Sequence, residues 1–591
     1  MLSVTTTARR RILWTFVGVG IFILLTAAAA LWTLSRAQVA RDSLESAAEV
    51  AATFPALLEA GDPAASAAAA DAFAADARTA RDATSDPVWR LAEFVPWVGS
   101  NLTAVREVSE IADDLAVSAI TPLVAIADDI DIARLGFTEG RLDLTPLVDA
   151  APVLEKANDA FQRSVDTVRD LPEPTVPLVA EAVDRLTEVL RPAATAVDAL
   201  DRAAALLPAM LGADGPRSYL LLMLNNAESR TYGGIPGAGA VITVDDGHIG
   251  IERQLSSGDF VIEKESVIPL SPSTIALFSD LPGRYIQNTM SPLPFAEGAS
   301  AAAALLERST GIAVDGVIAI DTTSLGYLLE ATGPLDVGPV VLDSGNAVDI
   351  LLSAAYREIP EPSVLDAFFA AVSLRLFESV TSGHVALPNL LTSVQRALDE
   401  HRLHVWSAHP EEQERIEGSE LETILLPDDD ATRVGVFVND LTGAKLDYYA
   451  DPTVTLEVDE CGATPTARVT VNWTNTIPAD AATSLPSYVN GFGLTDTPIG
   501  ETLTRLTVVG PQGWTLQDYS FDDARPGMQS AQYDDRTALQ TEFVTTAGGS
   551  HTFVVEYAGT VASDPERAWD LVSTPLARST NVEFVSASCG G

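Results

Sequence analysis

One long apolar segment near the amino terminus constrains this chain more than any other feature. Residues 12–34 are almost all apolar, and Arg9, Arg10 and Arg11 stand directly before them. A helix of about 20 apolar residues spans the hydrocarbon core of a bilayer. The arginines favour a cytoplasmic tail over residues 1–11. Since no second run of this length follows, we predict a single-pass plasma-membrane protein with a cytoplasmic N-terminus and an extracellular bulk.

A cleaved signal peptide is the alternative for the same segment. Residues 27–30 are four alanines, which would suit a signal peptidase. The apolar run nevertheless continues through Leu31, Trp32 and Leu34, which makes it longer than a signal core of about 7–15 residues. The length favours an uncleaved anchor, and whether the anchor is ever cleaved stays open.

The charge of the chain excludes one class of partner. It carries 36 basic and 82 acidic residues, a net charge of −46. Nucleic-acid binding needs clustered lysine and arginine, so we predict no nucleic-acid partner. The same acidity would repel anionic lipid headgroups, so the extracytoplasmic part is expected to stand off the membrane.

Residues 35–210 have the pattern of a helical bundle or stalk. The region is rich in alanine, and its apolar residues recur three and four positions apart, with prolines between the segments. Trp89, Phe94 and Trp97 form an aromatic cluster around Pro96. We expect these rings to pack between helices.

Residues 211–449 alternate strand and helix patterns, which indicates an α/β domain. Expected strands are residues 218–224, 240–244, 248–253, 314–321 and 434–438. Asp246 and Gly247 predict a tight hairpin turn. Expected helices are residues 324–331, with Thr322 or Thr323 as the cap, 347–356, 364–379 and 391–400.

Residues 450–591 alternate apolar and polar residues with a period of two. The clearest segments are residues 454–458, 467–473, 503–509 and 551–557, and they predict an antiparallel β-sandwich. Cys461 and Cys589 lie near its ends, and an extracytoplasmic location permits a disulfide between them. The predicted fold class is therefore multidomain α+β: anchor helix, helical bundle or stalk, central α/β domain and β-sandwich.

The loop that follows the first strand of the α/β domain is the best candidate for a ligand site. It combines glycines, which let backbone N–H groups approach an anion, with polar side chains and one arginine that can hold a phosphate in a bidentate manner. The candidates are Asn225, Asn226, Glu228, Arg230, Gly233 and Gly234. A structured connection whose asparagines satisfy backbone groups is an equally good interpretation. The loop matches neither the phosphate-loop nor the dinucleotide-binding fingerprint.

A metal site is not predicted from the histidines. His401, His404 and His409 lie close in sequence, but residues 404–406 look like a strand, in which residues three apart face opposite sides. The chain has no Gly-x-Ser-x-Gly elbow, so an ordinary hydrolase triad is not expected.

The loop sequence also carries a family resemblance. Residues 219–237 strongly resemble the hallmark of a bacterial family called domain of unknown function 4012, and residues 314–321, 331–334, 366–369 and 439–449 add matching motifs. Members of that family resemble this chain throughout, with a short cytosolic tail, one anchor helix, an alanine-rich helical region and an α/β part. The family has no established function.

A second resemblance implies a chemistry. Residues 288–337 are similar to the middle of LytR-CpsA-Psr proteins, which are anchored enzymes that move glycan polymers from a polyprenyl-pyrophosphate lipid onto the cell wall. By position, Arg230 and Arg253 resemble their pyrophosphate-binding arginines, and Asp259 or Glu228 would hold magnesium. The chain departs from that family on a later helix, where Arg375 replaces an arginine pair.

Two functional hypotheses follow. In the first, the protein is an extracytoplasmic cell-envelope protein that binds an envelope glycan, a lipid carrier or a partner protein, with no cofactor implied. The alternative is a phosphotransferase that moves a polyprenyl-pyrophosphate-linked glycan onto the cell wall with magnesium. Neither the ligand nor the oligomeric state is determined by the sequence.

Overall fold

The computed structural model describes residues 6–60, 62–127, 137–138, 140–359, 361–382, 385, 387–428, 431–461, 464–491, 497–559 and 568–586. The chain forms two compact units. The first contains Met1–Asp131 and Leu144–Pro208, and the second contains Ile132–Asp143 and Ala209–Gly591. The whole is a mixed α+β protein with one apolar helix at its N-terminus.

The first unit begins with α1 (Thr6–Ala51), which is longer than the sequence suggested. In the described part of the chain, one helix is long and apolar enough to cross a membrane, and its span begins at Trp14 with a mean hydropathy of 2.2. We expected this helix to end at residue 34. It continues because no proline or glycine follows before Ala51, so the apolar segment and the first bundle helix are continuous.

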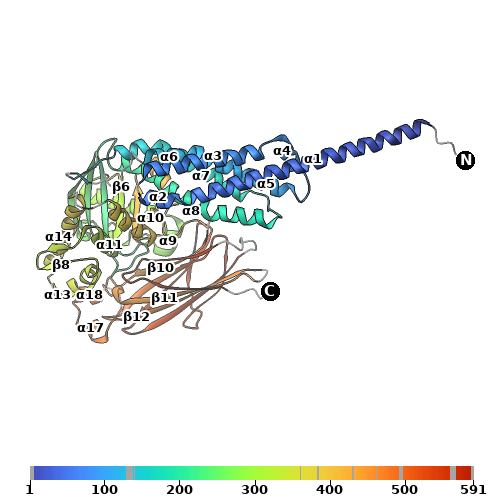
Figure 1. Ribbon diagram of the computed structural model, residues 1–591. Coiled ribbons are helices and arrows are strands. Elements are labelled where there is room, and N and C mark those ends of the chain that lie inside the picture. The colour runs from blue at the N-terminus through green and yellow to red at the C-terminus, as the bar shows by residue number, and fades with distance from the viewer. Residues whose placement is uncertain are drawn as a thin grey trace. The chain divides into compact units, whose positions relative to one another are not determined.

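The rest of the first unit is helical, as predicted (Figure 1). Its helices are α2 (Phe54–Ala60), α3 (Pro63–Thr84), α4 (Pro87–Ala92), α5 (Gly99–Leu115), α6 (Thr121–Ala127), α7 (Thr145–Arg169) and α8 (Pro177–Met210). A π-helical turn, Ala116–Ile120, joins α5 to α6. Many buried positions are alanines, among them Ala77, Ala80 and Ala157. Such small side chains let the helices pack closely.

The aromatic cluster of the bundle is only partly a core feature. Trp89 is fully buried, and its Nε1 donates to the carbonyl of Leu102 at 3.2 Å. Phe94 and Trp97, in contrast, are 85% and 86% exposed. The expectation that all three rings pack between helices is right for Trp89 and wrong for the other two, which lie in the turn between α4 and α5.

The second unit contains a seven-stranded mixed sheet in the order β1-β2-β5-β4-β3-β6-β9. The strands are β1 (Phe137–Thr138), β2 (Arg141–Leu142), β3 (Arg217–Asn225), β4 (Ile235–Asp245), β5 (His248–Ser256), β6 (Gly316–Asp321) and β9 (Leu403–Ser407). Only β3 and β6 pair in parallel among these described strands. The predicted hairpin at Asp246 and Gly247 is confirmed, with φ of 48° and 77°.

Helices surround this sheet in the same unit. They are α9 (Pro272–Phe278), α10 (Phe295–Thr310), α11 (Thr322–Thr332), α12 (Ala347–Asp349), α13 (Ala355–Glu358), α14 (Pro362–Thr381), α15 (Leu387–Asp399) and α16 (Pro410–Ile416), with a small hairpin of β7 (Leu335–Val337) and β8 (Val340–Leu342). The cap of α11 differs from the expectation. Asp321, rather than a threonine, accepts a hydrogen bond from the backbone of Ser324 at 2.8 Å.

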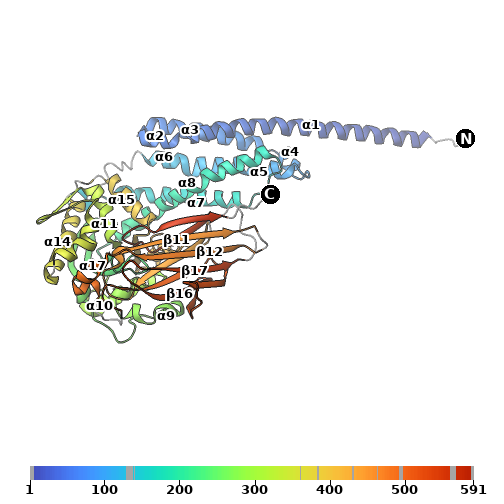
Figure 2. The same ribbon diagram turned by 90° about the horizontal axis from the view of Figure 1, so that it is seen from below.

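Two five-stranded sheets complete the second unit (Figure 2). One has the order β15-β16-β13-β10-β18 and the other β14-β17-β12-β11-β19. Their strands are β10 (Ala431–Asp440), β11 (Ala450–Asp459), β12 (Thr466–Asn475), β13 (Thr502–Val509), β14 (Thr515–Phe521), β15 (Gln529–Tyr533), β16 (Arg536–Thr545), β17 (Ser550–Ala558), β18 (Ala568–Ser573) and β19 (Asn581–Ser586). Two short helices, α17 (Ala479–Ser484) and α18 (Ser487–Asn490), follow β12.

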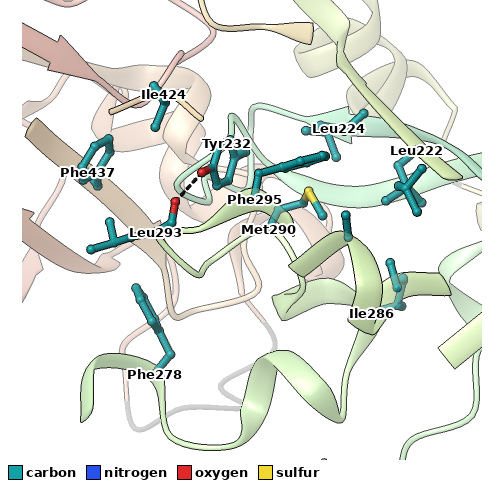
Figure 3. Packing of buried hydrophobic residues seen from close by; sticks show 14 of the residues in the cluster. Leu222, Leu224, Tyr232, Phe278, Ile286, Met290, Leu293, Phe295, Ile424 and Phe437 are labelled. Atoms are coloured by element: carbon teal, nitrogen blue, oxygen red, sulfur yellow. Dashed lines mark hydrogen bonds between the residues drawn. The ribbon is translucent and has the colours of Figure 1, made fainter. Parts of the chain in front are cut away.

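Strand β10 belongs to a different sheet from the one expected. We assigned residues 434–438 to the α/β sheet, but β10 pairs with β13 and β18. Val434, Val436 and Val438 pack into the apolar cluster shared by the two five-stranded sheets. Phe437 points the other way, into the cluster that contains Tyr232 (Figure 3). Burial on both faces gave β10 the continuous apolar sequence of a central α/β strand.

Candidate functional site

The loop between β3 and β4, predicted as a ligand site, is buried within the second unit. It leaves the sheet at Asn225 and re-enters at Ile235, where these two residues pair. Its polar side chains are at most 9% exposed. The buried members are Asn225, Asn226, Glu228, Ser229, Arg230 and Thr231. An unpaired buried polar group costs free energy, so each of these side chains is expected to have a hydrogen-bond partner inside the protein.

Asn226 joins three separate segments. Its Nδ2 donates to Asp321 Oδ2 and to the carbonyl of Pro575, each at 2.8 Å. Asp321 ends β6, and Pro575 follows β18. Its Oδ1 is buried and has no partner among the described residues. The side chain thus ties the central sheet to the five-stranded sheet that contains β18.

Glu228 is held by a lysine and belongs to a small polar group. Its Oε2 lies 2.7 Å from Lys445 Nζ and accepts from Asn225 Nδ2 at 3.1 Å. Asn225 Nδ2 also contacts the hydroxyl of Tyr356 at 3.0 Å. Burial, and then the charge of Glu228, raises the pKa of Tyr356 well above its ordinary value. Tyr356 therefore stays protonated at neutral pH.

Arg230 directs its guanidinium at oxygens of the protein. Its Nε donates to the carbonyl of Gln287 at 3.0 Å. Its Nη1 donates to the carbonyls of Ser229 at 2.7 Å and Asp440 at 2.9 Å, and Nη2 contacts Asn288 Oδ1 at 3.4 Å. Burial lowers the pKa of Arg230 from its usual value, while nearby acids, Asp440 first, oppose the shift. The guanidinium of Arg230 thus donates its hydrogen bonds to main-chain carbonyl oxygens and to one side-chain amide oxygen.

Two buried acids complete this part of the network. Asp440 accepts from the backbone N–H groups of Thr442 at 3.0 Å and Gly443 at 2.8 Å. Asp447 accepts from the backbone N–H of Ser229 at 3.2 Å. Burial raises the pKa of Asp440 above its usual range. Burial, reinforced by the charge of Asp440, raises the pKa of Asp447 to about 7.

A buried ion pair lies next to Asn226. Arg402 Nη1 is 2.6 Å from Asp321 Oδ2, and both side chains are almost fully buried. Arg402 also donates to the carbonyl of Leu576 at 3.2 Å and to Glu400 Oε2 at 2.8 Å. Burial raises the pKa of Glu400, but hydrogen bonds from Tyr327 and Arg402 outweigh it and hold that pKa below its usual value.

We call this network the polar junction; its charged members are Glu228, Arg230, Asp321, Arg402, Asp440, Lys445 and Asp447. Acids and cations thus lie together in a region of low dielectric. A buried charge without a partner would be strongly destabilising there.

The glycines of the loop serve close packing. Gly233 has a φ of 109°, a conformation that other residues rarely adopt. At Gly234 a Cβ atom would lie 2.0 Å from the carbonyl oxygen of Asn225. Both glycines are thus required by the fold itself.

Arg253 and Asp259 lie apart from the polar junction. Both are exposed, on β5 and on the short 3₁₀ turn Ser257–Asp259. Asp259 Oδ2 accepts from the backbone N–H of Ser256 at 2.7 Å; this bond, with a smaller contribution from Arg253, lowers the pKa of Asp259. Among the described residues, no hydrogen bond or ion pair joins Arg253 or Asp259 to Arg230.

The histidines occupy different environments. His404 is fully buried on β9 against the rings of Tyr232 and Phe295, with centroids at 4.7 and 5.3 Å. Burial lowers the pKa of His404 to about 3, so the ring is neutral. His409 Nε2 instead lies 2.9 Å from Asp315. Within the described part of the chain, no group of three His, Cys, Asp or Glu side chains is placed to hold a metal ion.

Sequence reasoning did not assign a site role to several members of the polar junction. Asp321, Asp440 and Lys445 were noticed only as parts of family motifs, and Arg402 and Asp447 not at all. One signal was present: Asn225, Asp321 and Asp440 each end a strongly apolar strand. Nothing in the sequence marks Arg402 or Asp447, because Asp321 and Ser229, the partners that bring them into the junction, are distant in the chain.

The fold and the junction together define a mixed α+β protein with an N-terminal apolar helix and a buried polar network at the ends of β3, β6 and β10. Residues 214–356 match the family model described as "Protein of unknown function (DUF4012)". This match confirms the resemblance to domain of unknown function 4012 over that part of the chain, which includes β3, the loop and β6.

Other comparisons add little. No curated protein matches the chain. Two solved structures of a mutant two-domain M1 zinc metallopeptidase show a short likeness. The one bound to L-tryptophan is 13% identical, with a TM-score of 0.12, covering 20% of this chain and 22% of that chain. The one bound to L-arginine is 11% identical, with a TM-score of 0.10, covering 23% and 22%. The chain thus spans about a fifth of the length of these proteins.

Proposed function

We propose that this chain is a membrane-anchored, extracytoplasmic cell-envelope protein that binds an envelope glycan, a lipid carrier or a partner protein and does not catalyse a reaction. In this proposal α1 is the anchor, with the N-terminus in the cytoplasm. The two five-stranded sheets act as a β-sandwich that contacts the partner. The loop of the family motif serves the fold.

One observation carries the proposal. Every charged side chain of the loop that sequence reasoning offered to a ligand is buried and has a partner inside the protein: Glu228 has Lys445, and Arg230 has four oxygens. A pyrophosphate needs several cations or a metal to offset its charge. To reach Arg230 it would have to displace the carbonyl groups that the guanidinium already binds.

The alternative is a LytR-CpsA-Psr-like phosphotransferase with magnesium, and it would have to use other groups. Arg253 and Asp259 are exposed and close enough for the arginine to lower the pKa of the aspartate. They would supply one cation and one magnesium ligand. This is the one observation in favour of the alternative.

A titration separates the two. The full-length chain in detergent micelles is titrated with a short-chain polyprenyl pyrophosphate, with and without Mg²⁺, by isothermal calorimetry. The proposal expects that any binding is independent of Mg²⁺ and unchanged by Arg253→Gln or Asp259→Asn. Saturable binding that Arg253→Gln or Asp259→Asn weakens at least tenfold would contradict it and favour the phosphotransferase. Because both side chains are exposed, these variants are expected to fold normally.

The proposed binding function is tested by identifying the lipids and glycans that copurify with the protein. Full-length chain purified in mild detergent is analysed by mass spectrometry for lipids and glycans.

The membrane topology is tested by protease treatment of intact cells. We expect digestion of the part after α1 from outside. A C-terminal tag that stays protected until lysis would contradict the anchored, extracytoplasmic arrangement.

A further inference from the structure

The turn between α4 and α5 presents large apolar side chains to solvent. Phe94 is 85% exposed and Trp97 is 86% exposed, while Leu91, Val95 and Val98 are each about half exposed or more. Isolated exposed apolar residues are normal, but a contiguous group of this kind marks a surface for another apolar partner. Both aromatic rings come from one short segment, so they would enter such a partner together.

The fold holds Trp97 in this outward position. Its φ is 63°, a left-handed conformation that is unusual for a large residue. Its carbonyl accepts from Asn101 Nδ2 at 3.1 Å and from Thr175 Oγ1 at 3.0 Å. A Cβ at Gly99 would lie 1.9 Å from the carbonyl oxygen of Glu93. The turn is thus closely packed, and exposure of Trp97 is built into it.

A second turn lies beside the first and has the same character. The buried side chain of Asn101 also accepts from the backbone N–H groups of Thr175 and Val176, at 3.0 and 2.8 Å. Val176 and Leu178, at the start of α8, are 44% and 48% exposed. One asparagine therefore fixes two neighbouring turns, and each presents apolar side chains.

These turns lie where the apolar part of α1 ends. Trp32 Nε1 donates to Asp86 Oδ2 at 3.0 Å, and Asp86 is the residue that caps α4. Arg36 Nη2 donates to the carbonyl of Asp82 at 2.5 Å, at the end of α3. Figures 1 and 2 both show α4 at the end of the bundle from which α1 projects.

The length of α1 places this end of the bundle at a membrane surface. Trp14 and Trp32 are five helical turns apart, which is about 27 Å, close to the roughly 30 Å of a hydrocarbon core. Tryptophans are enriched at both membrane–water interfaces. If Trp32 marks the outer interface, Asp86 and α4 begin at that interface.

We propose that Phe94 and Trp97 insert into the outer leaflet beside α1 and form a second contact with lipid. The inference rests on the proposed membrane anchoring. The neighbouring turn also exposes Asp170 and Glu173, so the contact is apolar and does not need anionic lipid. The bundle end thus rests on the membrane, whereas net charge alone suggested that the whole extracytoplasmic part stands off.

Quenching of tryptophan fluorescence by brominated lipid tests this contact. The full-length chain is placed in phosphatidylcholine nanodiscs whose acyl chains carry bromine near the headgroup or near the methyl end. Bromine quenches tryptophans that it touches. We expect W97F to reduce the quenched part of the emission, more strongly with bromine near the headgroup, and W14F to reduce it as a measure of the anchor.

A matched control uses an exposed position far along the bundle. Leu200 is 55% exposed on α8 and lies 23 residues beyond Pro177, about 34 Å along the helix. The extra tryptophan of L200W is expected to remain unquenched. Quenching of L200W equal to that of Trp97 would overturn the inference, because it would show nonspecific contact with lipid.

The outcomes separate this inference from the anchoring. If W14F lowers the quenching and W97F does not, the anchor stands and the lipid contact of the turn is overturned. If neither lowers it, the anchoring fails and the inference fails with it. Phe94→Ser combined with Trp97→Ser gives a second test: it should keep the melting temperature, since both side chains are exposed, and lose the same quenched component.

Discussion

Arg402 and Asp321 form an ion pair of 2.6 Å whose side chains are only 5% and 0% exposed. The same carboxylate accepts from Asn226 and caps α11, and the same arginine binds the carbonyl of Leu576 beyond β18. The pair therefore connects the family-motif loop, the central sheet and a five-stranded sheet. It gives the polar residues at the ends of these strands partners inside the protein.

Removing one partner of this pair should be strongly destabilising. Arg402→Met leaves the Asp321 carboxylate without its cation in a buried site, which costs about 3–5 kcal/mol. The control is Arg375→Met, because Arg375 pairs with Glu378 at 3.0 Å on the surface, with both side chains half exposed or more. Exposed pairs contribute about 0–1 kcal/mol. Denaturant unfolding of the full-length chain in detergent measures both, and equal effects of the two variants would contradict the structural role of the pair.

Asp447 should make stability depend on pH. Its pKa rises from 3.8 to about 7 on folding, so between these values the folded state binds more protons than the unfolded state. The resulting stabilisation is complete below pH 4 and is lost as the pH rises to about 7. Asparagine imitates the protonated acid and does not titrate. We expect wild type to lose about 2–4 kcal/mol relative to Asp447→Asn between pH 4 and pH 8.

The quantity to measure is the difference in the free energy of unfolding between wild type and Asp447→Asn. His404, whose pKa is lowered to about 3, acts in the opposite direction: its contribution is present above pH 6.5 and is lost as the pH falls. Subtracting the variant from wild type at each pH removes His404 and the other groups that do not interact with Asp447. A difference that stays constant from pH 4 to pH 8 would show that Asp447 titrates normally.

The close packing of the motif loop gives a third prediction. At Gly234 an added Cβ would meet the backbone of Asn225 at 2.0 Å, and backbone cannot move aside cheaply. Gly234→Ala is expected to destabilise the protein by about 3 kcal/mol or more. Gly527→Ala is the control, since nothing lies within 4 Å of its Cβ and its φ is not positive. It should change stability by less than about 0.5 kcal/mol, and a similarly small effect at Gly234 would be evidence against the packing.

The disulfide between Cys461 and Cys589 remains a prediction, because Cys589 lies outside the described residues. Strand pairing supports it: β11 and β19 run in parallel, with Val458 opposite Ser586, and each cysteine follows one of these strands by a few residues. A bond there would close a loop of about 130 residues. Cys589→Ser is expected to cost about 2–5 kcal/mol, seen as a lower melting temperature. Quantitative labelling of both thiols in the native protein would exclude the bond.

Local patterns predicted the elements of this fold well. The Asp246 hairpin turn and the strands from β3 to β6 follow from side-chain periodicity and turn chemistry, which act over a few residues. The sheet that β10 joins does not, because apolar residues on both faces suit any fully covered strand. The same limit applies to Phe94 and Trp97: an aromatic residue in a turn packs or projects according to contacts such as those of Asn101, which the local sequence does not specify.

The candidate site, like the fold, could be predicted only where the local sequence determines it. The sequence places the loop from Asn225 to Gly234 after a buried strand, as the structure does, while its role as a ligand site stays a prediction. Asp447 binds the loop from 218 residues further along the chain. Arg402 pairs with Asp321, which in turn binds Asn226 of the loop, and only the fold brings these residues together. Without them, an arginine in a glycine-containing loop has the appearance of an anion clamp.

Arg230→Lys provides the last prediction. Its guanidinium contacts the carbonyls of Gln287, Ser229 and Asp440 through two different nitrogens, and an ammonium group cannot reproduce that planar geometry. Carbonyl groups left unsatisfied in a buried site cost about 1–3 kcal/mol each, so we expect a loss of about 2–4 kcal/mol in the free energy of unfolding. Arg253→Lys, on the exposed face of β5, should change it by less than about 0.5 kcal/mol. Chemical unfolding of the two variants in parallel decides the matter: if Arg230→Lys is as stable as wild type, the guanidinium is not needed for the fold, and its role as a ligand-binding group would have to be tested again.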